Sequence, residues 1–595
     1  MEYNEHFLHP IDTTKLLSKK KRIKRELIEN LKNPIHKKIA ILGGSTTDEV
    51  VDQIELFLLK NGIEADFYQS EYNQYWQDAV FGNDELDNFK PDIIYIHTNW
   101  RNIFTFPLIG DDIATVQSKL KEVYGHFECA WKALKQKFAC PIIQNNFERP
   151  NYRLLGNRDI WDAHGRCNFI FRLNDMFYEF ASLNENFYIN DLEYLASDFG
   201  ISKWNDSFYY HMYKYAMNLN AIPLVAHSVV NIIKSIYGKN KKVLSLDLDN
   251  TLWGGVIGDD GQEGIAIGPE IPEGQAFCEF QQYCKDLKNI GVVLTVNSKN
   301  EKENAILGLN HPSSFLKPDD FVLIKANWQS KDVNILESAS ELNLGVESFV
   351  FVDDNPMERD IVKTQIPSVS VPKVEDAEHY IDVIDHEGYF ETTAISEEDL
   401  RKTEMYKANK ERANQQKAYA DYGDYLDSLQ MIATIKPFDD ISVSRIAQLT
   451  NKSNQFNLTT MRCSEDDIRH MKDSSDYITL FGSLADKFGD NGIVAITSGE
   501  MIKDDLHIRL WLMSCRVLKR GMENAMMDRL VDLCKNKKIK RLIGYYYPTA
   551  KNSMVREFYK QYGFTIQEQN ADESVWSLCV EDYVSQKKHI TTNAI

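Results

Sequence analysis

Short apolar runs rich in β-branched residues alternate with amphipathic helical stretches near the start of the chain. Three such runs occur within residues 36–47, 91–100 and 140–147, and helical patterns separate them. Strands that alternate with helices are typical of a parallel sheet covered on both faces. We therefore predict a doubly wound α/β domain over residues 1–238.

The same pattern restarts after residue 240. Apolar strands are predicted within residues 241–250, 292–298 and 348–354, with helices between them. Each strand ends in polar residues, and open α/β sheets place their ligands at the carboxyl ends of their strands. Residues 239–375 are therefore predicted to form a second α/β domain with a site at that edge.

The remainder of the chain is predicted to hold a connector and a third domain. Residues 376–430 are highly charged and helical in pattern, which indicates a connecting helix or two. An α+β domain is predicted over residues 431–595, with strands at 492–500, 506–514 and 539–547 and helices at 522–536 and 551–564. The predicted fold class is thus a multidomain α/β protein.

The composition of the chain limits which binding partners and which cellular locations are expected. The 595 residues are 43% hydrophobic and 26% charged, as in folded proteins, and the net charge is −20. That acidity argues against nucleic acid and anionic membranes as partners, because both reward dense Lys and Arg. The nine cysteines include no C-x-x-C pair, the N-terminus lacks an apolar signal, and we find no run of about 18 apolar residues. A cytoplasmic location with free thiols is expected.

Two stretches are basic despite the overall acidity. Residues 15–38 form a basic amphipathic stretch, which is either a surface helix or a docking arm. Residues 503–541 carry 11 basic and 5 acidic side chains. A basic surface of this kind would attract an acidic protein partner.

Two carboxylates follow the strand within 241–250. Asp247 and Asp249 are one residue apart at its end, and buried acids need a cation to offset their charge. A divalent metal would do so. One carboxylate could then attack a phosphoryl group while its neighbour handles the leaving-group proton.

Four further polar residues of the predicted domain stand at the ends of strands or at the start of a helix. Ser298 ends the next strand and Lys331 opens a helix, and the strand within 348–354 ends in Asp353 and Asp354. A hydroxyl and a lysine can hold phosphoryl oxygens, and the last two carboxylates can complete an oxygen-rich magnesium shell. Lys325 lies near enough in sequence to compete for the lysine role.

In these four motifs and their order the sequence resembles the haloacid dehalogenase (HAD) superfamily of phosphotransferases. The resemblance implies that Asp247 is the nucleophile and that Asp249 is the general acid/base, with its backbone carbonyl on the metal. It implies phosphate binding by Ser298 and Lys331, the latter in W-x-x-K at 328–331, and Mg²⁺ binding by Asp247, Asp249, Asp353 and Asp354.

A longer set of motifs narrows the resemblance. LSLDLDNTLWGGVIGDDG at 244–261, NSKN at 297–300 and FVDDNPMER at 351–359 resemble FkbH-like proteins, which prepare glyceryl thioesters on acyl carrier proteins. The insert at 252–275 is too short for a large cap domain. An open site of this kind can admit a substrate presented on a protein arm.

The third domain resembles FkbH-like proteins in NKSNQFNLTTMR at 451–462 and LWLMSCRVLKRGME at 510–523, and GNAT acetyltransferases in fold. In the turn at 516–521, Lys519 replaces the first glycine expected of a coenzyme A site, which disfavours ordinary acetyl transfer. Cys515 lies beside this basic turn, where positive charge would favour the thiolate, although a buried strand-end cysteine is the alternative. The resemblance favours a catalytic Cys515, with Asn457, His507 and Arg516 as further acyl-site candidates.

The first domain weakly resembles SGNH-type esterases. Ser45 in GGSTTDE would be the nucleophile and Asn99 in HTNW an oxyanion donor, whereas His97 and Arg101 read as strand-end polar residues. The expected Gly-Asp-Ser is Gly-Gly-Ser here, and the late pair Asp206 and His211 has the wrong spacing. These departures favour a structural or docking role.

Taken together, the resemblances imply a bifunctional glyceryl transferase/phosphatase. Cys515 would take the phosphoglyceryl group of 1,3-bisphosphoglycerate, the Mg²⁺ site would dephosphorylate it, and the phosphopantetheine thiol of an acyl carrier protein would receive glyceryl. The alternatives are a Mg²⁺-dependent small-molecule phosphatase with non-catalytic accessory domains and a non-enzymatic carrier-protein scaffold.

Overall fold

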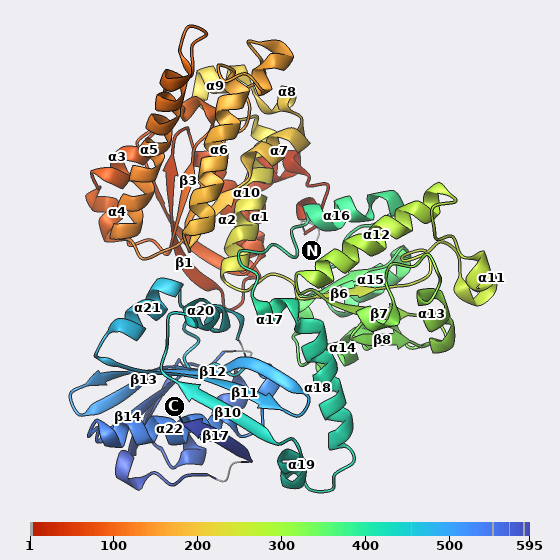
Figure 1. Cartoon of the computed structure of the whole chain (residues 1–595), viewed down its shortest axis with the longest axis vertical. Coiled ribbons are helices and arrows are strands. Elements are labelled where there is room, and N and C mark those ends of the chain that lie inside the picture. The colour runs from red at the N-terminus through yellow and green to blue at the C-terminus, as the bar shows by residue number, and fades with distance from the viewer. Residues whose placement is uncertain (1–3, 454, 550–551, 571, 587–588, 595) are drawn as a thin grey trace. The chain divides into compact units, whose positions relative to one another are not determined.

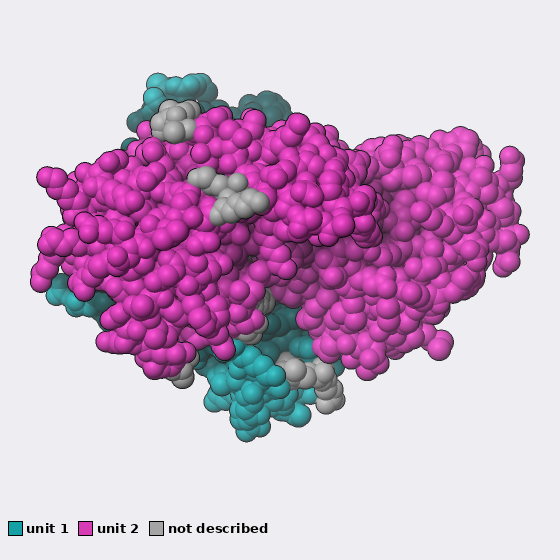
Figure 2. Space-filling model, turned by 90° about the horizontal axis from the view of Figure 1, so that it is seen from below, with its two compact units in different colours: residues 1–235 teal, residues 236–595 magenta. Residues whose placement is uncertain are grey.

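The chain is described from a computed structural model that covers residues 4–453, 455–549, 552–570, 572–586 and 589–594, without the side chains of residues 452, 515 and 594. It divides into two compact units, Met1–Ser235 and Ile236–Ile595, which Figure 2 shows in two colours. The second unit contains the segments predicted as the second domain, the connector and the third domain. Each unit is a mixture of helices and sheet, so the chain is an α/β multidomain protein.

The first unit is built on a parallel sheet in the order β2-β1-β3-β4-β5. Its strands are β1 Ile35–Gly43, β2 Ile63–Gln69, β3 Ile93–His97, β4 Ile142–Asn145 and β5 Phe187–Asn190. The order reverses direction between β1 and β3, and such a switch point opens a crevice at the carboxyl edge of a doubly wound sheet. Ser45 and His97 lie at that edge.

Helices lie on both faces of this sheet (Figure 1). They are α1 Thr13–Glu29, α2 Asp48–Lys60, α3 Tyr75–Val80, α4 Asp84–Phe89, α5 Ile113–Lys137, α6 Arg166–Leu183, α7 Leu192–Phe199, α8 Ile201–Trp204, α9 Ser207–Tyr213 and α10 Ile222–Ile236. Alternate strand residues such as Leu42 and Ile94 share one core with Trp131 of α5 and Phe177 of α6. This burial is what the period-two pattern of a strand requires.

Helices α1 and α10 differ in character. In the basic α1, Lys20 pairs with Glu49 and Asp52 of α2, and Lys24 pairs with Glu55, which favours the surface-helix interpretation over a docking arm. The stretch Leu219–Ile236 that contains α10 is long and apolar enough to cross a membrane by length and composition, which the sequence analysis did not find. It is 61% buried inside the structure, as a core helix is.

The second unit opens with a four-stranded parallel sheet in the order β8-β7-β6-β9. Its strands are β6 Val243–Leu246, β7 Val293–Ser298, β8 Leu323–Ala326 and β9 Phe349–Val352, and its helices are α11 Ile257–Gly264, α12 Pro272–Asn289, α13 Lys302–Leu309, α14 Lys331–Leu342, α15 Pro356–Gln365 and α16 Tyr380–His386. Between β6 and α12 lies only the eight-residue α11. In the part of the chain that the structure describes, the insert after β6 is therefore too short to form a large cap domain.

The connector is helical, as its pattern predicts, and leads into a second, eight-stranded sheet in the order β15-β16-β14-β13-β12-β11-β10-β17. The helices of the connector are α17 Glu397–Leu400, α18 Lys402–Gln416 and α19 Tyr422–Ser428. The strands of the sheet are β10 Met431–Lys436, β11 Tyr477–Asp486, β12 Gly489–Ile502, β13 Asp505–Met513, β14 Arg541–Tyr546, β15 Thr565–Gln569, β16 Ser574–Cys579 and β17 Ile590–Ala594, with helices α20 Val443–Lys452, α21 Glu465–Asp473 and α22 Met522–Asn536.

One predicted helix is wrong. Residues 551–564 were predicted as a helix, but their described part forms two short 3-10 turns, Ser553–Val555 and Tyr559–Tyr562. Phe558, Tyr559 and Tyr562 are all buried in the core of the eight-stranded sheet. Aromatic residues are weak helix formers, and here burial of adjacent rings takes precedence over a continuous helix.

Candidate active site

The strand register brings the predicted carboxylates to one edge of the four-stranded sheet. Leu246 at the end of β6 pairs with Val296 of β7 and Val352 of β9. The residues that follow these three positions are therefore neighbours across the sheet edge. Asp247, Ser298 and Asp353 all lie there, and all three are buried.

Lys331 is the cation of this cluster. It is the first residue of α14, and its side chain is 3% exposed. The Nζ atom lies 2.7 Å from Asp247 Oδ2 and also pairs with Asp353 Oδ2. Burial alone would lower the pKa of Lys331, but these two carboxylates outweigh it and raise the pKa. Lys331 is therefore held as a charged group between two acids.

The start of α14 is fixed from the neighbouring strand. Asn297 Nδ2 donates to the Lys331 carbonyl oxygen at 2.8 Å, and Asn334 Nδ2 donates to Asn297 Oδ1 at 3.1 Å. Lys325, the alternative lysine, instead pairs with Glu337 and Glu341 on the outer side of α14. The structure thus places Lys331 in the cluster and Lys325 outside it.

Three carboxylates could hold a metal ion. One ligand oxygen from each of Asp247, Asp353 and Asp354 lies within 4.8 Å of the others. Asp247 Oδ1 is buried and has no hydrogen-bond partner among the described residues. Burial, with the charge of Asp247 added, raises the pKa of Asp353 and of Asp354. Lys331 alone does not offset these acids, and an all-oxygen donor set of this kind fits Mg²⁺.

Asp249 lies beside this group and its side chain is not one of the three. Its Oδ1 accepts hydrogen bonds from Trp253 Nε1 at 2.9 Å and Ile257 N at 3.0 Å, and its Oδ2 accepts from Asn300 Nδ2 at 3.0 Å. Burial is the main cause that raises the pKa of Asp249. A carboxyl with a raised pKa is suited to hold and release a proton.

Two positioning residues were not assigned by sequence reasoning. Asn300 fixes Asp249, and Arg359 Nη1 donates to the carbonyl oxygens of Asp353 at 2.7 Å and Asp354 at 2.6 Å. Both stand inside the motifs NSKN and FVDDNPMER. Their position in those motifs could have indicated a role, but the groups to which they donate hydrogen bonds are known only from the fold.

The residues predicted around Cys515 do not all meet. Cys515 begins a 3-10 turn, Cys515–Val517, and its side chain lies outside the described part of the structure. Asn457 is fully buried, and its Oδ1 accepts from Thr460 N at 2.9 Å, which is a contact within its own loop. His507 contacts Tyr545 OH at 2.8 Å and stands six residues before Met513 on β13, about 20 Å along the strand. The structure therefore does not bring His507 to the turn.

The turn at 516–521 is covered by the connector. Arg520 pairs with Asp486 at 3.4 Å and donates to Asn409 of α18 at 3.1 Å. Tyr422 OH of α19 donates to the Lys519 carbonyl oxygen at 2.9 Å. Side chains thus already contact the turn at which the predicted fold would place a coenzyme A pyrophosphate.

In the first unit, Ser45 is buried and its Oγ has no hydrogen-bond partner among the described residues. Asp206 caps α9 by accepting from Tyr209 N at 3.1 Å, and His211 is exposed, so neither hydrogen-bonds to Ser45. Asn99 caps a 3-10 turn by accepting from Arg101 N at 3.0 Å. The predicted esterase residues are therefore not assembled into a hydrolytic triad.

Other polar residues at this edge are buried. His97 contacts Tyr95 OH at 2.9 Å, and burial lowers its pKa to about 4. The Arg101 guanidinium lies 3.8 Å from the Tyr210 ring centre. Glu148 accepts from Trp100 N at 3.3 Å, and burial raises its pKa to about 8. Glu148, which the sequence analysis did not single out, is therefore held as the neutral acid near pH 7.

Comparisons with known proteins agree with the phosphatase geometry. Residues 38–234 match the family model described as FkbH, N-terminal domain. A solved structure, the N-terminal part of the protein BF1531 from Bacteroides fragilis, contains a phosphatase domain and was crystallised with Mg. It is 29% identical, covers 63% of this chain and 99% of its own, and has a TM-score of 0.58. The chain is thus similar to a solved structure that contains a phosphatase domain.

Other comparisons are weaker. The ribosomal-protein-S18-alanine N-acetyltransferase from Escherichia coli covers 25% of this chain and 94% of its own at 13% identity, with a TM-score of 0.21. The PaiA N-acetyltransferase from Thermoplasma acidophilum, in complex with coenzyme A, covers 24% and 97% at 14% identity, with a TM-score of 0.19. No curated protein sequence matches the chain. None of these matches supports the SGNH likeness predicted for residues 1–238.

Proposed function

We propose that the chain is a Mg²⁺-dependent phosphatase that acts through Asp247. The observation that carries this proposal is the position of Lys331, buried between Asp247 and Asp353 at the edge where Asp354 adds a third carboxylate. Where the acids are exposed, as Glu337 and Glu341 are around Lys325, water screens the charge of a second acid, but the buried acids around Lys331 lack that screening. Here a surplus of acids surrounds one lysine, and that surplus suits a site that receives a cation and a phosphoryl group together.

The residues divide the chemistry between them. Asp247, Asp353 and Asp354 would hold Mg²⁺, which when bound screens the negative charge of the phosphoryl oxygens. An Asp247 oxygen attacks phosphorus, the bond to the ester oxygen breaks, and the leaving oxygen takes a proton from Asp249. Water then attacks the aspartyl-phosphate, gives its proton to Asp249, and releases inorganic phosphate. Lys331 and Ser298 hold the phosphoryl oxygens throughout.

We further propose that the second unit couples this step to acyl transfer. The Cys515 thiolate attacks the acyl carbon of 1,3-bisphosphoglycerate, the bond from carbon to the phosphate oxygen breaks, and phosphate leaves. The thioester then passes to the phosphopantetheine thiol of an acyl carrier protein, which returns the Cys515 thiol. The resemblance of the motifs around Cys515 to FkbH-like proteins supports this part. A cytoplasmic setting would supply both reactants.

The test combines phosphate release with intact-mass analysis. The protein is incubated with Mg²⁺, 1,3-bisphosphoglycerate and a holo carrier protein, and a glyceryl mass on the carrier is expected. Asp247→Asn should abolish dephosphorylation, whereas Asp259→Asn, an exposed acid of the same domain, should not. Cys515→Ala should abolish acyl transfer, with the exposed Cys579→Ala as its matched control.

A phosphatase with non-catalytic accessory domains is the second candidate function. The contacts of Tyr422 and Arg520 across the turn at 516–521 favour it, because they leave that turn engaged by the connector. This candidate predicts that Cys515→Ala keeps full turnover and that no acylated protein forms. Mg²⁺-dependent phosphate release that Asp247→Asn abolishes would reject the carrier scaffold, whereas retention of that release in Asp247→Asn would reject catalysis through Asp247.

A further inference from the structure

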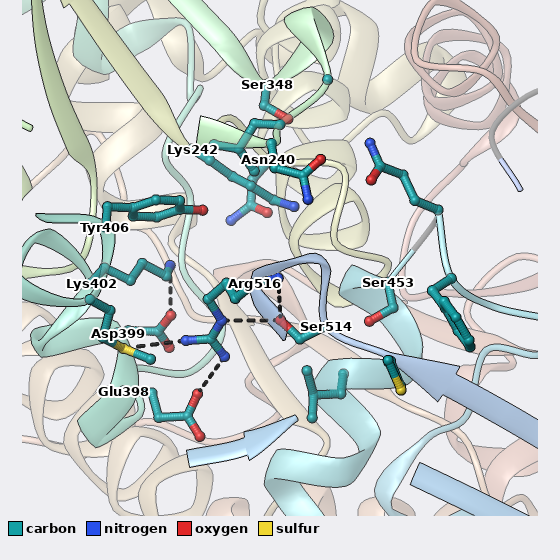
Figure 3. Close-up of a pocket in the computed structure, with 18 of the residues that line it drawn as sticks. Asn240, Lys242, Ser348, Glu398, Asp399, Lys402, Tyr406, Ser453, Ser514 and Arg516 are labelled. Atoms are coloured by element: carbon teal, nitrogen blue, oxygen red, sulfur yellow. Dashed lines mark hydrogen bonds and ion pairs between the residues drawn. The ribbon is translucent and has the colours of Figure 1, made fainter. Parts of the chain in front are cut away.

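A cavity of about 420 Å³ lies inside the second unit, away from the aspartate cluster (Figure 3). Five segments line it: the residues before β6, the residues before β9, helices α17 and α18, helix α20 with the residues after it, and the end of β13 with the turn that follows. Its volume falls in the range of about 300 to 1,000 Å³ that is typical of small-molecule sites. It is therefore large enough for a ligand with several polar groups.

The walls of this cavity are positively charged although the chain as a whole is acidic. Five cationic and three anionic side chains line it: Lys241, Lys242, Lys402, Arg445, Arg516, Glu347, Glu398 and Asp399. Lys402 and Asp399 form an ion pair at 2.7 Å and offset each other. Lysine and arginine in excess make a cavity of this size suitable for an anion.

The two arginines of the cavity share one acid. Glu398 Oε2 pairs with Arg445 and lies 3.1 Å from Arg516 Nη2, and Figure 3 shows Arg516 between Ser514 and Glu398. One carboxylate thus serves two guanidinium groups. Arg445 Nε is also buried and has no hydrogen-bond partner among the described residues. An anionic ligand would supply the missing charge and the missing acceptor.

The position of the cavity separates it from the phosphatase site and links it to Cys515. Lys242 precedes β6 and Asp247 follows it, so the cavity lies at the amino edge of the sheet, about 16 Å from the cluster along the strand. Met513, Ser514 and Arg516 line the wall, and these residues flank Cys515 on both sides. A ligand in this cavity would therefore lie against the turn that begins at Cys515.

We propose that the cavity binds a small phosphorylated acid and holds it beside the turn at Cys515. The choice of this ligand rests on the proposed function, whereas the charge and position of the cavity do not. Its guanidinium groups match phosphate and carboxylate oxygens in bidentate geometry. Binding here and dephosphorylation at Asp247 then occur at opposite edges of one sheet, so the acyl group has to move between two sites.

The test measures binding of 3-phosphoglycerate to the full chain by titration calorimetry in EDTA. Without metal, the carboxylates around Asp247 repel an anion, so the heat reports the cavity. Arg516→Gln leaves Glu398 paired with Arg445, and it should raise the Kd about tenfold or more. Glu398→Gln removes the competing carboxylate, and it should tighten binding about threefold or more. Arg556→Gln, an exposed arginine of the same unit, should leave the Kd unchanged.

The gain of affinity in Glu398→Gln separates a ligand site from a merely structural ion pair, since damage to the fold weakens binding. The proposal is overturned if Arg516→Gln binds as tightly as the wild type, if Glu398→Gln binds more weakly, or if only 4′-phosphopantetheine binds. Phosphate release from p-nitrophenyl phosphate with Mg²⁺ is measured in parallel on the wild type. If the wild type releases no phosphate, the proposed phosphatase function is rejected, and the calorimetric result on the cavity is unaffected. If phosphate is released but 3-phosphoglycerate does not bind, only the proposed cavity site is rejected.

Discussion

Lys331→Met removes the cation of the aspartate cluster and leaves its two partners buried together. At 2.7 Å, and with an effective dielectric constant of about 20, the attraction between Lys331 Nζ and the Asp247 carboxylate is about 6 kcal/mol. Desolvation offsets part of that attraction in the wild type. Removing one partner of a buried ion pair costs about 3 to 5 kcal/mol, because the remaining charge stays buried without compensation.

The free energy of unfolding of the second unit should therefore fall by about 3 kcal/mol in EDTA. The loss is near the lower end of the range of about 3 to 5 kcal/mol, because Asp353 can take up a proton and so leave less buried charge without a partner. The second unit, Ile236–Ile595, has an unfolding entropy of about 0.76 kcal/mol/K at about 2.1 cal/mol/K per residue, so that loss lowers its Tm by about 4 °C. Mg²⁺ should restore more of the Tm in Lys331→Met than it adds to the wild type, since the bound cation replaces the missing charge.

The assay is differential scanning fluorimetry of the full chain with EDTA and with Mg²⁺. Lys325→Met is the matched control, because Lys325 pairs with Glu337 and Glu341 on the helix surface, and such pairs contribute about 1 kcal/mol or less. The reasoning is refuted if Lys331→Met melts with the wild type in EDTA, or if Mg²⁺ shifts both proteins equally.

Three further predictions concern other buried groups. Ser298→Ala should lower kcat/KM for phosphate release by about 10- to 100-fold, the loss expected for one hydrogen bond to a charged group, with circular dichroism unchanged. Glu148 has a pKa raised to about 8 in the fold, so the folded state keeps its proton after the unfolded chain has lost it. The Glu148 contribution to the stability of the first unit should therefore fall as pH rises from about 4.5 to about 8, by at most about 1.4 kcal/mol per pH unit, and chemical denaturation of Glu148→Gln should show a flatter profile. Asp486→Asn leaves Arg412 and Arg520 without their buried carboxylate, and urea unfolding should show a loss of about 3 kcal/mol or more, whereas the exposed Asp504→Asn should lose less than about 1 kcal/mol.

The sequence predicted that the carboxylates of the candidate site lie together, because these residues follow directly from strand ends. Asp247, Ser298 and Asp353 each end or follow an apolar strand, and parallel strands bring such positions to one edge. Lys331 follows from its place in W-x-x-K. Local pattern and sheet topology were sufficient here, since no side chain had to be placed across a long loop.

Features that depend on non-local packing could not be predicted. The contact of Tyr422 with the Lys519 carbonyl joins segments 97 residues apart, and no periodic pattern encodes it. The contact of Arg520 in the basic segment 503–541 with Asp486 of β11 is likewise not encoded in the local pattern. The separation of His507 from the turn at Cys515, by contrast, follows from the strand predicted at 506–514, because His507 stands near its start and Cys515 follows its end.

The ion pairs of Asp486 link a helix of the connector to the eight-stranded sheet. Arg412 of α18 donates to Asp486 through Nε at 2.8 Å, and the same carboxylate serves Arg520 in the turn before α22. A C-terminal fragment that began at β10 would keep the buried acid and one base and would lose the better-placed one. Helix α18 is therefore part of the folding unit of the eight-stranded sheet, and a fragment that keeps Asp486 fully paired has to include Arg412.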